Sequence, residues 1–214
     1  MNLPLDIHTH HRPLPAGSAV LNCFAGEFRP EAGGWYSVGI HPWRLGQSPW
    51  QEEAFRTRFQ EAAAHPQVVA VGEAGIDRLA DAPLGLQLEA LRYQAAVAEA
   101  VRKPLVLHLV KAAAELLALK RELRPTVPWV IHGFRGKAQL ADTYLKHGFF
   151  LSFGEKYQEE ALRRVPLERL FIETDESTVP VARLYERAAG VRGLSADELL
   201  EAVSCNVCRV FFVH

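Results

Sequence analysis

The 214-residue chain lacks the net charge that would hold a polyanion across a broad surface, because 24 Lys and Arg stand against 25 Asp and Glu, a net charge of −1. A bulk electrostatic grip on nucleic acid or on an anionic membrane is therefore excluded, and any polyanion has to be held locally. The sequence also lacks an apolar run near the roughly 18 residues that span a bilayer. Its first residues, MNLPLDIHTH, have neither the basic start nor the apolar stretch of a signal peptide, so we expect a cytoplasmic protein without membrane contact.

Cysteine is scarce as well. Three cysteines are too few for a disulfide framework in a chain of this length, which favours free thiols in a reducing compartment. Internal repeats and low-complexity runs are absent, so a repeat architecture is not expected. The composition, 49% hydrophobic and 23% charged, is typical of a globular protein, and we expect one domain over residues 1–214. Histidine, with nine residues, is unusually frequent.

Short apolar or β-branched runs recur along the chain and predict eight strands. These runs cover residues 3–8, 19–24, 35–40, 68–73, 104–109, 129–132, 149–153 and 170–174. Helical patterns lie between the later runs and after the last one, at about residues 48–64, 84–98, 112–123, 137–146, 155–164, 179–188 and 195–211. Capping boxes mark the first and last of these helices, at Ser48 and Ser195.

Strands that alternate with helices indicate a parallel α/β sheet, and eight such strands indicate a TIM-type (β/α)8 barrel. The first two gaps between strands, residues 11–18 and 25–34, are too short for a crossover helix. We therefore expect a reduced barrel that lacks its first two outer helices. The wall left there is bare, filled from elsewhere in the chain, or covered by a second subunit in a homo-oligomer.

Ligand-type side chains fall at the carboxyl ends of the predicted strands. In a barrel of parallel strands these ends converge on one rim, where active sites are built. His8 and His10, two residues apart on extended chain, point the same way and can hold one metal ion. The full set at five strand ends is His8, His10, Glu73, His108, His132 and Asp175.

Six protein ligands are too many for one catalytic metal that keeps a position open, which favours two divalent ions. Glu73 can bridge the ions through its two oxygens, and Asp175 can bind one ion and take the proton of an attacking water. Such a pair generates a metal-bound hydroxide and clamps both oxygens of a displacement at phosphorus. Imidazole-rich coordination favours Zn, Mn, Fe or Ni over Mg.

Taken in order, the motifs resemble the TatD-like metal-dependent hydrolases, a family of amidohydrolase-type barrels that includes DNases acting on 3′ ends. The resemblance runs from Asp6 to Phe211. Its matching segments are D-x-H-x-H at residues 6–10, G-x-H-P at 39–42, G-E-x-G-[IL]-D at 72–77, glutamines at 87 and 94, P-[LV]-x-[IL]-H at 104–108, H-x-F-x-G at 132–136, E-T-D at 173–175 and an Asn before a buried aromatic at 206 and 211.

The resemblance implies a role for each matched ligand. His8, His10 and Asp175 would hold one metal, His108 and His132 the other, with Glu73 between them. His41 would lie at the substrate end of the pocket, and we expect Trp43 at the pocket mouth, where an aromatic face can hold a single-stranded end.

The sequence departs from the family pattern around the substrate. Lys111 stands near a position where the family has arginine, and it can contact phosphate only as a point charge. Arg135 places a guanidinium beside the second metal. The segment that usually follows E-T-D is missing. We therefore expect a phosphoester hydrolase, best a deoxyribonuclease, that acts on a DNA 3′ end or a small phosphoester.

Two alternatives remain open on the sequence alone. An amidohydrolase of cyclic amides or lactones would use similar ligands, although Glu73 stands on the fourth strand, where that chemistry would use a carboxylated lysine. A non-catalytic barrel that binds metal only as a scaffold is the other alternative.

Overall fold

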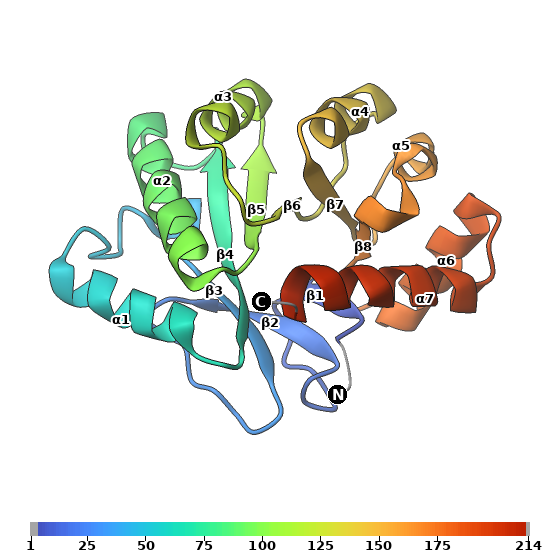
Figure 1. Ribbon diagram of the computed structural model, residues 1–214, viewed down its shortest axis with the longest axis horizontal. Helices are drawn as coiled ribbons and strands as arrows, with labels where there is room; N and C mark the ends of the chain where they lie inside the picture. The colour runs from blue at the N-terminus through green and yellow to red at the C-terminus, as the bar shows by residue number, and fades with distance from the viewer. Residues whose placement is uncertain (1–3, 213–214) are drawn as a thin grey trace.

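A computed structural model describes residues 4–212 and shows eight parallel strands in a nearly closed barrel. The strands follow one another around the sheet in chain order, each paired in parallel with the next. Figure 1 shows helices around the outside of these strands. The strands are β1 (Asp6–Thr9), β2 (Ala19–Phe24), β3 (Trp35–Gly39), β4 (Val68–Asp77), β5 (Leu105–Val110), β6 (Trp129–Ile131), β7 (Phe149–Phe153) and β8 (Leu170–Ile172).

The barrel closes through a single bridge between Thr9, at the end of β1, and Asp175, just after β8. The backbone N–H of Asp175 donates to the carbonyl of His8 at 2.9 Å, and the N–H of His10 donates to the carbonyl of Asp175 at 3.1 Å. The TIM-type barrel predicted from the strand pattern is thereby confirmed.

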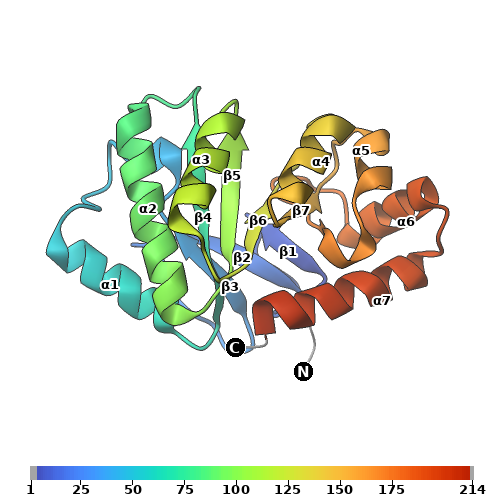
Figure 2. The same ribbon diagram turned by 45° about the horizontal axis from the view of Figure 1, so that its top comes forward.

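Within residues 4–212, seven α-helices form an arc outside the strands, and Figures 1 and 2 both show this arrangement. No helix lies between β1 and β2 or between β2 and β3 in this part of the described chain, as predicted. The helices are α1 (Glu53–Ala64), α2 (Leu84–Val101), α3 (Ala113–Leu123), α4 (Ala138–Lys146), α5 (Glu159–Arg164), α6 (Val181–Arg192) and α7 (Ala196–Val207), with short turns η1 (Pro42–Arg44), η2 (Leu167–Arg169) and η3 (Cys208–Phe212).

Loops cover the wall that has no helices. A cavity of about 240 Å³ lies there, and Leu21 and Cys23 of β2 and Trp35 of β3 are among the residues that line it. The ring of Phe212 packs edge-on against that of Trp35, with 4.9 Å between centroids. The end of η3 therefore fills part of this side.

Some element boundaries differ from the sequence predictions. The predicted capping box at Ser48 is wrong, because α1 starts at Glu53 with Glu52 as N-cap and no side-chain capping bond. The buried Trp50 anchors a separate turn there, and its carbonyl accepts a hydrogen bond from the Arg56 side chain at 3.2 Å. At the last helix the predicted capping box of Ser195 and Glu198 is present.

The first predicted strand also begins later than expected, at Asp6, and position 3 lies outside the described residues. The fourth strand is longer than predicted and runs on to Asp77. All ten of its residues are buried, which is typical of a barrel strand covered on both faces.

Glycine lets β4 lie unusually close to its neighbours. Gly75, at φ +149°, has no room for a side chain, since a Cβ there would overlap the carbonyl oxygen of His108. The register between β4 and β5 shifts between Val71 and Ala74. Over this stretch β4 has one residue more than β5, as in a β-bulge.

We expect Gly75→Ala to destabilise the fold by about 2–4 kcal/mol, because β4 or β5 has to move to accept the methyl group. Gly85→Ala is the matched control, since a Cβ at Gly85, in the first turn of α2, meets nothing within 4 Å. Urea unfolding of both variants measures the difference. Equal stability of the two would contradict the close approach of β4 and β5.

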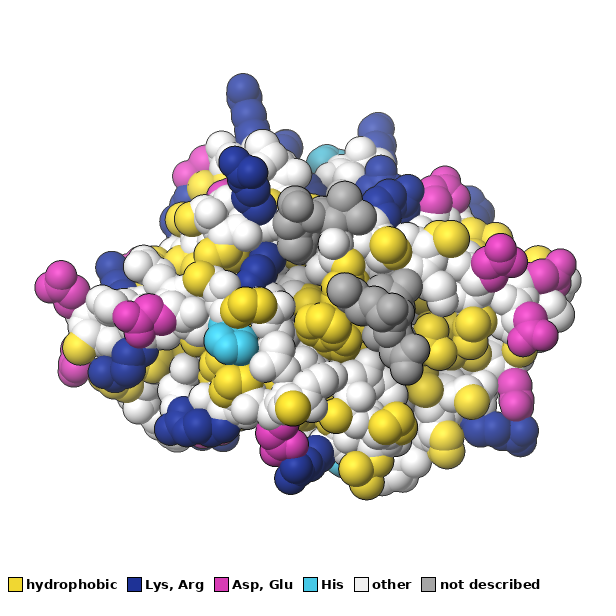
Figure 3. Space-filling model, turned by 60° about the horizontal axis from the view of Figure 1, so that its bottom comes forward, with side chains coloured by type: hydrophobic (Ala, Val, Ile, Leu, Met, Phe, Trp, Pro, Cys, Tyr) yellow, Lys and Arg dark blue, Asp and Glu magenta, His cyan; other side chains and the backbone are white. Residues whose placement is uncertain are grey.

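The surface agrees with the near-neutral composition. On the face in Figure 3, hydrophobic side chains occupy much of the centre and charges of both signs lie around the edge, so no broad basic track crosses it. No described helix is long and apolar enough to cross a membrane.

Candidate active site at the carboxyl ends of the strands

The barrel brings most of the predicted site residues together at the carboxyl ends of its strands. Glu73 lies in the middle of β4, and the others lie in the last residues of a strand or just after one, in contact with Glu73 or with a partner of Glu73. The residues gathered there are His8, His10, His41, Glu73, His108, His132 and Asp175.

The carboxylate of Glu73 lies at the centre of the cluster and divides the imidazoles into two groups. Its Oε2 lies 3.3 Å from Nε2 of His8 and 3.3 Å from Nε2 of His10, both from the end of β1. Its Oε1 faces the remaining rings, at 3.1 Å from His41 Nε2, 2.9 Å from His108 Nδ1 and 2.8 Å from His132 Nε2. Each of the two oxygens of this carboxylate thus faces a separate set of imidazole nitrogens.

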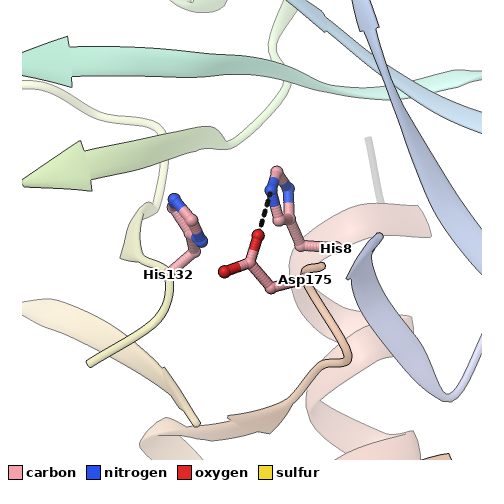
Figure 4. A group of neighbouring side chains, drawn as sticks. All are labelled: His8, His132 and Asp175. Carbon is pink, nitrogen blue, oxygen red and sulfur yellow. Dashed lines mark ion pairs between the residues drawn. The ribbon is translucent and has the colours of Figure 1, made fainter. Parts of the chain in front are cut away.

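Asp175 lies on the β1 side of Glu73. Its Oδ1 is 3.6 Å from His10 Nε2 and 3.9 Å from His8 Nε2. Figure 4 shows the Asp175 carboxylate between the rings of His8 and His132. The residue adopts the left-handed region at φ 56°, an unfavourable conformation for a side-chain-bearing residue that the backbone bonds to β1 hold in place.

Two buried carboxylates orient the histidines on the other side. Asp77 Oδ2 lies 3.1 Å from His108 Nε2, so Nδ1 of that ring is the nitrogen that faces the centre. Glu173 Oε1 lies 3.3 Å from His132 Nδ1 and accepts the N–H of Gly133 at 2.6 Å, which leaves Nε2 of His132 facing the centre. Such carboxylate partners fix the tautomer and raise the basicity of metal-binding imidazoles.

His41 is held in the tautomer that donates toward Glu73. Its Nδ1 accepts the backbone N–H of Trp43 at 3.1 Å, which places the ring proton of the neutral imidazole on Nε2. Nε2 then donates to Glu73 Oε1 and has no lone pair for a metal. Although His41, Glu73 and His108 lie close enough to form a ligand group, this bonding makes His41 a hydrogen-bond donor.

Electrostatics keep the central carboxylate ionised. Burial alone would raise the pKa of Glu73, but the facing imidazoles, His132 first, hold it well below its usual value. For His132, burial alone would lower the pKa. The neighbouring carboxylates of Glu73 and Glu173 raise it by more, so the pKa of His132 lies well above its usual value. The ionised carboxylate of Glu73 thereby lies where the histidine nitrogens converge.

The donor set fits a divalent metal. His8 is fully buried, yet neither of its ring nitrogens makes a hydrogen bond to a described residue. A buried polar group without a partner is costly. Groups of three ligand atoms around it, His8 with His132 and Asp175, and His8 with His10 and Glu73, lie within the spacing that one ion spans.

Three supporting residues were not singled out from the sequence. Asn22, in the middle of β2, donates to Glu73 Oε2 at 3.4 Å and accepts the backbone N–H of Glu73 at 2.8 Å. The signal that could have revealed it is a pair of polar residues in register on two apolar strands, since Ser37 of β3 faces Asn22 and donates to it at 3.1 Å. Asp77 and Glu173 were recognised as polar strand ends without a role.

Asp6, at the start of β1, is a buried carboxylate that holds the segment after β8. It accepts the backbone N–H of Thr174 at 3.0 Å and the Thr174 hydroxyl at 2.6 Å, which joins β1 to the segment after β8. Burial raises the pKa of Asp6 to about 7, although both bonds from Thr174 act in the opposite direction.

The two cations predicted to bind substrate, Arg135 and Lys111, lie at different distances from the carboxylate cluster. Arg135 extends over the site, with a guanidinium nitrogen 3.9 Å from Asp175 Oδ2 and a side chain that is 61% exposed. Lys111 follows β5 at the same rim, but it makes no hydrogen bond or ion pair with any residue from 4 to 212. Of the two, only Arg135 touches the carboxylate cluster.

The family is decided by comparison with known proteins. A model described as TatD related DNase matches residues 27–212 of this chain. The chain belongs to the TatD family. It is 37% identical over 200 residues to the uncharacterized metal-dependent hydrolase YabD of Bacillus subtilis strain 168, covering 83% of this chain and 77% of that protein.

Another TatD-family relative has a named activity. The 3′-5′ ssDNA/RNA exonuclease TatD of Cronobacter turicensis is 34% identical over 158 residues, 69% of this chain and 59% of that protein. Among solved structures, YJJV, a TatD homologue from Escherichia coli K12, has a TM-score of 0.84 at 22% identity, covering 99% of this chain and 98% of that one, and supports the fold. Membership makes the chain a metal-dependent hydrolase.

In this TatD-family site, Glu173→Gln should weaken metal binding about 10- to 100-fold, the usual effect of losing a carboxylate partner of a ligand histidine. Glutamine retains an oxygen that accepts from Gly133 and His132 but removes the charge. Titration of the metal-free protein with Zn²⁺ gives the affinity. Glu176→Gln, at an exposed position nearby, is the control, and an equal effect of both substitutions would refute the assignment.

Proposed function

We propose that this TatD-family hydrolase cleaves phosphodiester bonds at the 3′ end of single-stranded nucleic acid, with DNA as the first substrate to test. The observation that carries the proposal is the carboxylate of Glu73, which faces His8 and His10 with one oxygen and His108 and His132 with the other. A divided ligand set of this kind suits two ions that act on one phosphate.

The residues present would hold the ions in two groups. His8, His10 and Asp175 would bind one ion, His108 Nδ1 and His132 Nε2 the other, and Glu73 would bridge them. Bound there, two divalent ions would acidify a water molecule and offset the charge that develops on the phosphate. An imidazole-rich set favours Zn, Mn, Fe or Ni over Mg.

The chain's own residues supply positioning and proton transfer. Asp175, partly open to solvent beside Arg135, accepts the proton of the attacking water. Arg135 forms charge-assisted hydrogen bonds to the non-bridging oxygens of the phosphate, for which its planar guanidinium is suited. His41 donates its Nε2–H to Glu73 Oε1 and orients that carboxylate.

Two features support a nucleic-acid end rather than a long duplex. The relative from Cronobacter turicensis is named a 3′-5′ ssDNA/RNA exonuclease. The chain has a net charge of −1, so phosphate has to be caught at the site itself instead of along an extended basic groove.

The test uses purified protein with Mn²⁺, Mg²⁺ or Zn²⁺ and a single-stranded DNA labelled at its 5′ end. We expect stepwise shortening from the 3′ end, loss of activity with EDTA, and no reaction when the 3′-terminal linkages are phosphorothioates. A dihydropyrimidine amide assayed in parallel should remain intact. Hydrolysis of the amide without hydrolysis of DNA would contradict the proposal, as would inactivity with every ion.

A further inference from the structure

Trp43 is the exposed tryptophan of the active-site rim. Its side chain is 61% exposed, whereas Trp50 and Trp129 are buried at 1% and 0% and belong to the core. It lies in the short turn η1 directly after His41. An indole that remains open to water contributes little to folding through burial, so packing does not account for its place.

The ring is held rigidly despite its exposure. Its Nε1–H donates to Asp77 Oδ2 at 2.7 Å, and its ring forms T-shaped pairs with His41 and His108 at centroid distances of 4.9 and 5.7 Å. The backbone N–H of the same residue donates to His41. The indole is thus fixed against the site although the residue is 61% exposed.

The bond from Nε1 to Asp77 places the indole at a defined position relative to the proposed metal ligands. Asp77 Oδ2 also faces His108 Nε2 at 3.1 Å, so Trp43 and a proposed metal ligand share one carboxylate oxygen. The indole therefore lies directly beside the ligand cluster, within reach of a substrate group bound next to it.

A cation follows Trp43 in the same turn, η1. The guanidinium of Arg44 lies 4.1 Å from the ring centroid of Phe24, at the end of β2. Among residues 4–212 it has no carboxylate partner. Aromatic faces combined with unpaired cations are the features by which proteins hold single-stranded nucleic acid.

We propose that Trp43 is a stacking platform for a nucleobase of the substrate, the base of a nucleotide adjoining the scissile phosphate. The inference rests on the proposed function and specifies its substrate as base-bearing. Stacking tolerates any base, since each has a π face. The site would therefore discriminate strongly against substrates that lack a base at this position and weakly among sequences.

The test measures binding of a 5′-fluorescein DNA hexamer by anisotropy in Mn²⁺, with phosphorothioate linkages at its 3′ end to prevent cleavage. A second hexamer has abasic residues at its two 3′-terminal positions. Trp43→Ala should weaken binding of the base-bearing hexamer about 10-fold or more, and Trp43→Phe, which keeps a ring face, less than about 3-fold. All three proteins should bind the abasic hexamer with the same weak affinity.

Several outcomes would overturn the stacking role. An equal loss in Trp43→Phe and Trp43→Ala would assign the effect to the lost hydrogen bond with Asp77. Because Asp77 also contacts His108, the metal content of both variants would then be lower than that of the unaltered protein. Equal losses on both hexamers, or no loss in Trp43→Ala, would also overturn it while leaving phosphodiesterase activity in place. Failure of the unaltered protein to bind or cleave any nucleic acid would overturn the proposed function as well.

Discussion

Replacement of Glu73 by glutamine should lower phosphodiester turnover at least about 1000-fold, the scale seen when a central catalytic group is removed. An amide keeps the size of the side chain but is neutral and has only one acceptor oxygen. It therefore cannot present a negatively charged oxygen to each of the two groups of histidines. The variant should also lose bound metal, because the four proposed ligand histidines, from both sides of the pocket, converge on this carboxylate. Steady-state kinetics and metal content per chain measure the two effects.

Folding must be checked separately, since Glu73 is buried. Circular dichroism and thermal unfolding of Glu73→Gln should match those of the metal-free parent protein. Glu61→Gln, on an exposed position of α1, is the control for the substitution itself. If Glu73→Gln kept near-normal metal-dependent activity, the bridging role would be wrong.

Asp175→Asn should lower kcat about 100- to 10,000-fold, the contribution typical of a positioned general base. Asparagine can still offer an oxygen to an ion beside His8 and His10, so the loss of metal should be smaller than in Glu73→Gln. The backbone bonds that hold Asp175 to β1 do not involve the side chain and should persist. Rapid-mix single-turnover measurements at saturating metal separate the loss of chemistry from the loss of metal.

The size of the two effects on metal content is itself a test. Equal loss of metal in Asp175→Asn and Glu73→Gln would indicate that Asp175 acts only as a ligand. Retention of the full rate in Asp175→Asn would remove it from both proposed roles.

Much of the barrel could be predicted because its signals are local. Each strand is a short apolar run, and the cap at Ser195 lies three residues from its partner Glu198. The absence of helices in the two early gaps follows from the small number of residues between the predicted strands there. The start of α1 could not be predicted, because the burial of Trp50 depends on packing against Tyr93 of α2, which is distant in the sequence.

The residues of the site also separate into those that the sequence predicts and those that depend on distant contacts. Residues at strand ends could be gathered from the sequence, since parallel strands in a barrel share one rim. Asn22 could not, because its contact with Glu73 arises from strand register across 51 positions of the chain. The orientation of individual rings also depends on the fold, as when Asp77 turns Nδ1 of His108 inward.

Anomalous scattering from crystals grown with Zn²⁺ or Mn²⁺ tests the divided metal centre most directly, because it reports ion number, identity and ligands together. We expect two peaks per chain on opposite sides of the Glu73 carboxylate, one near His8, His10 and Asp175 and one near His108 and His132. A single peak, or none at saturating metal, would contradict the dinuclear site.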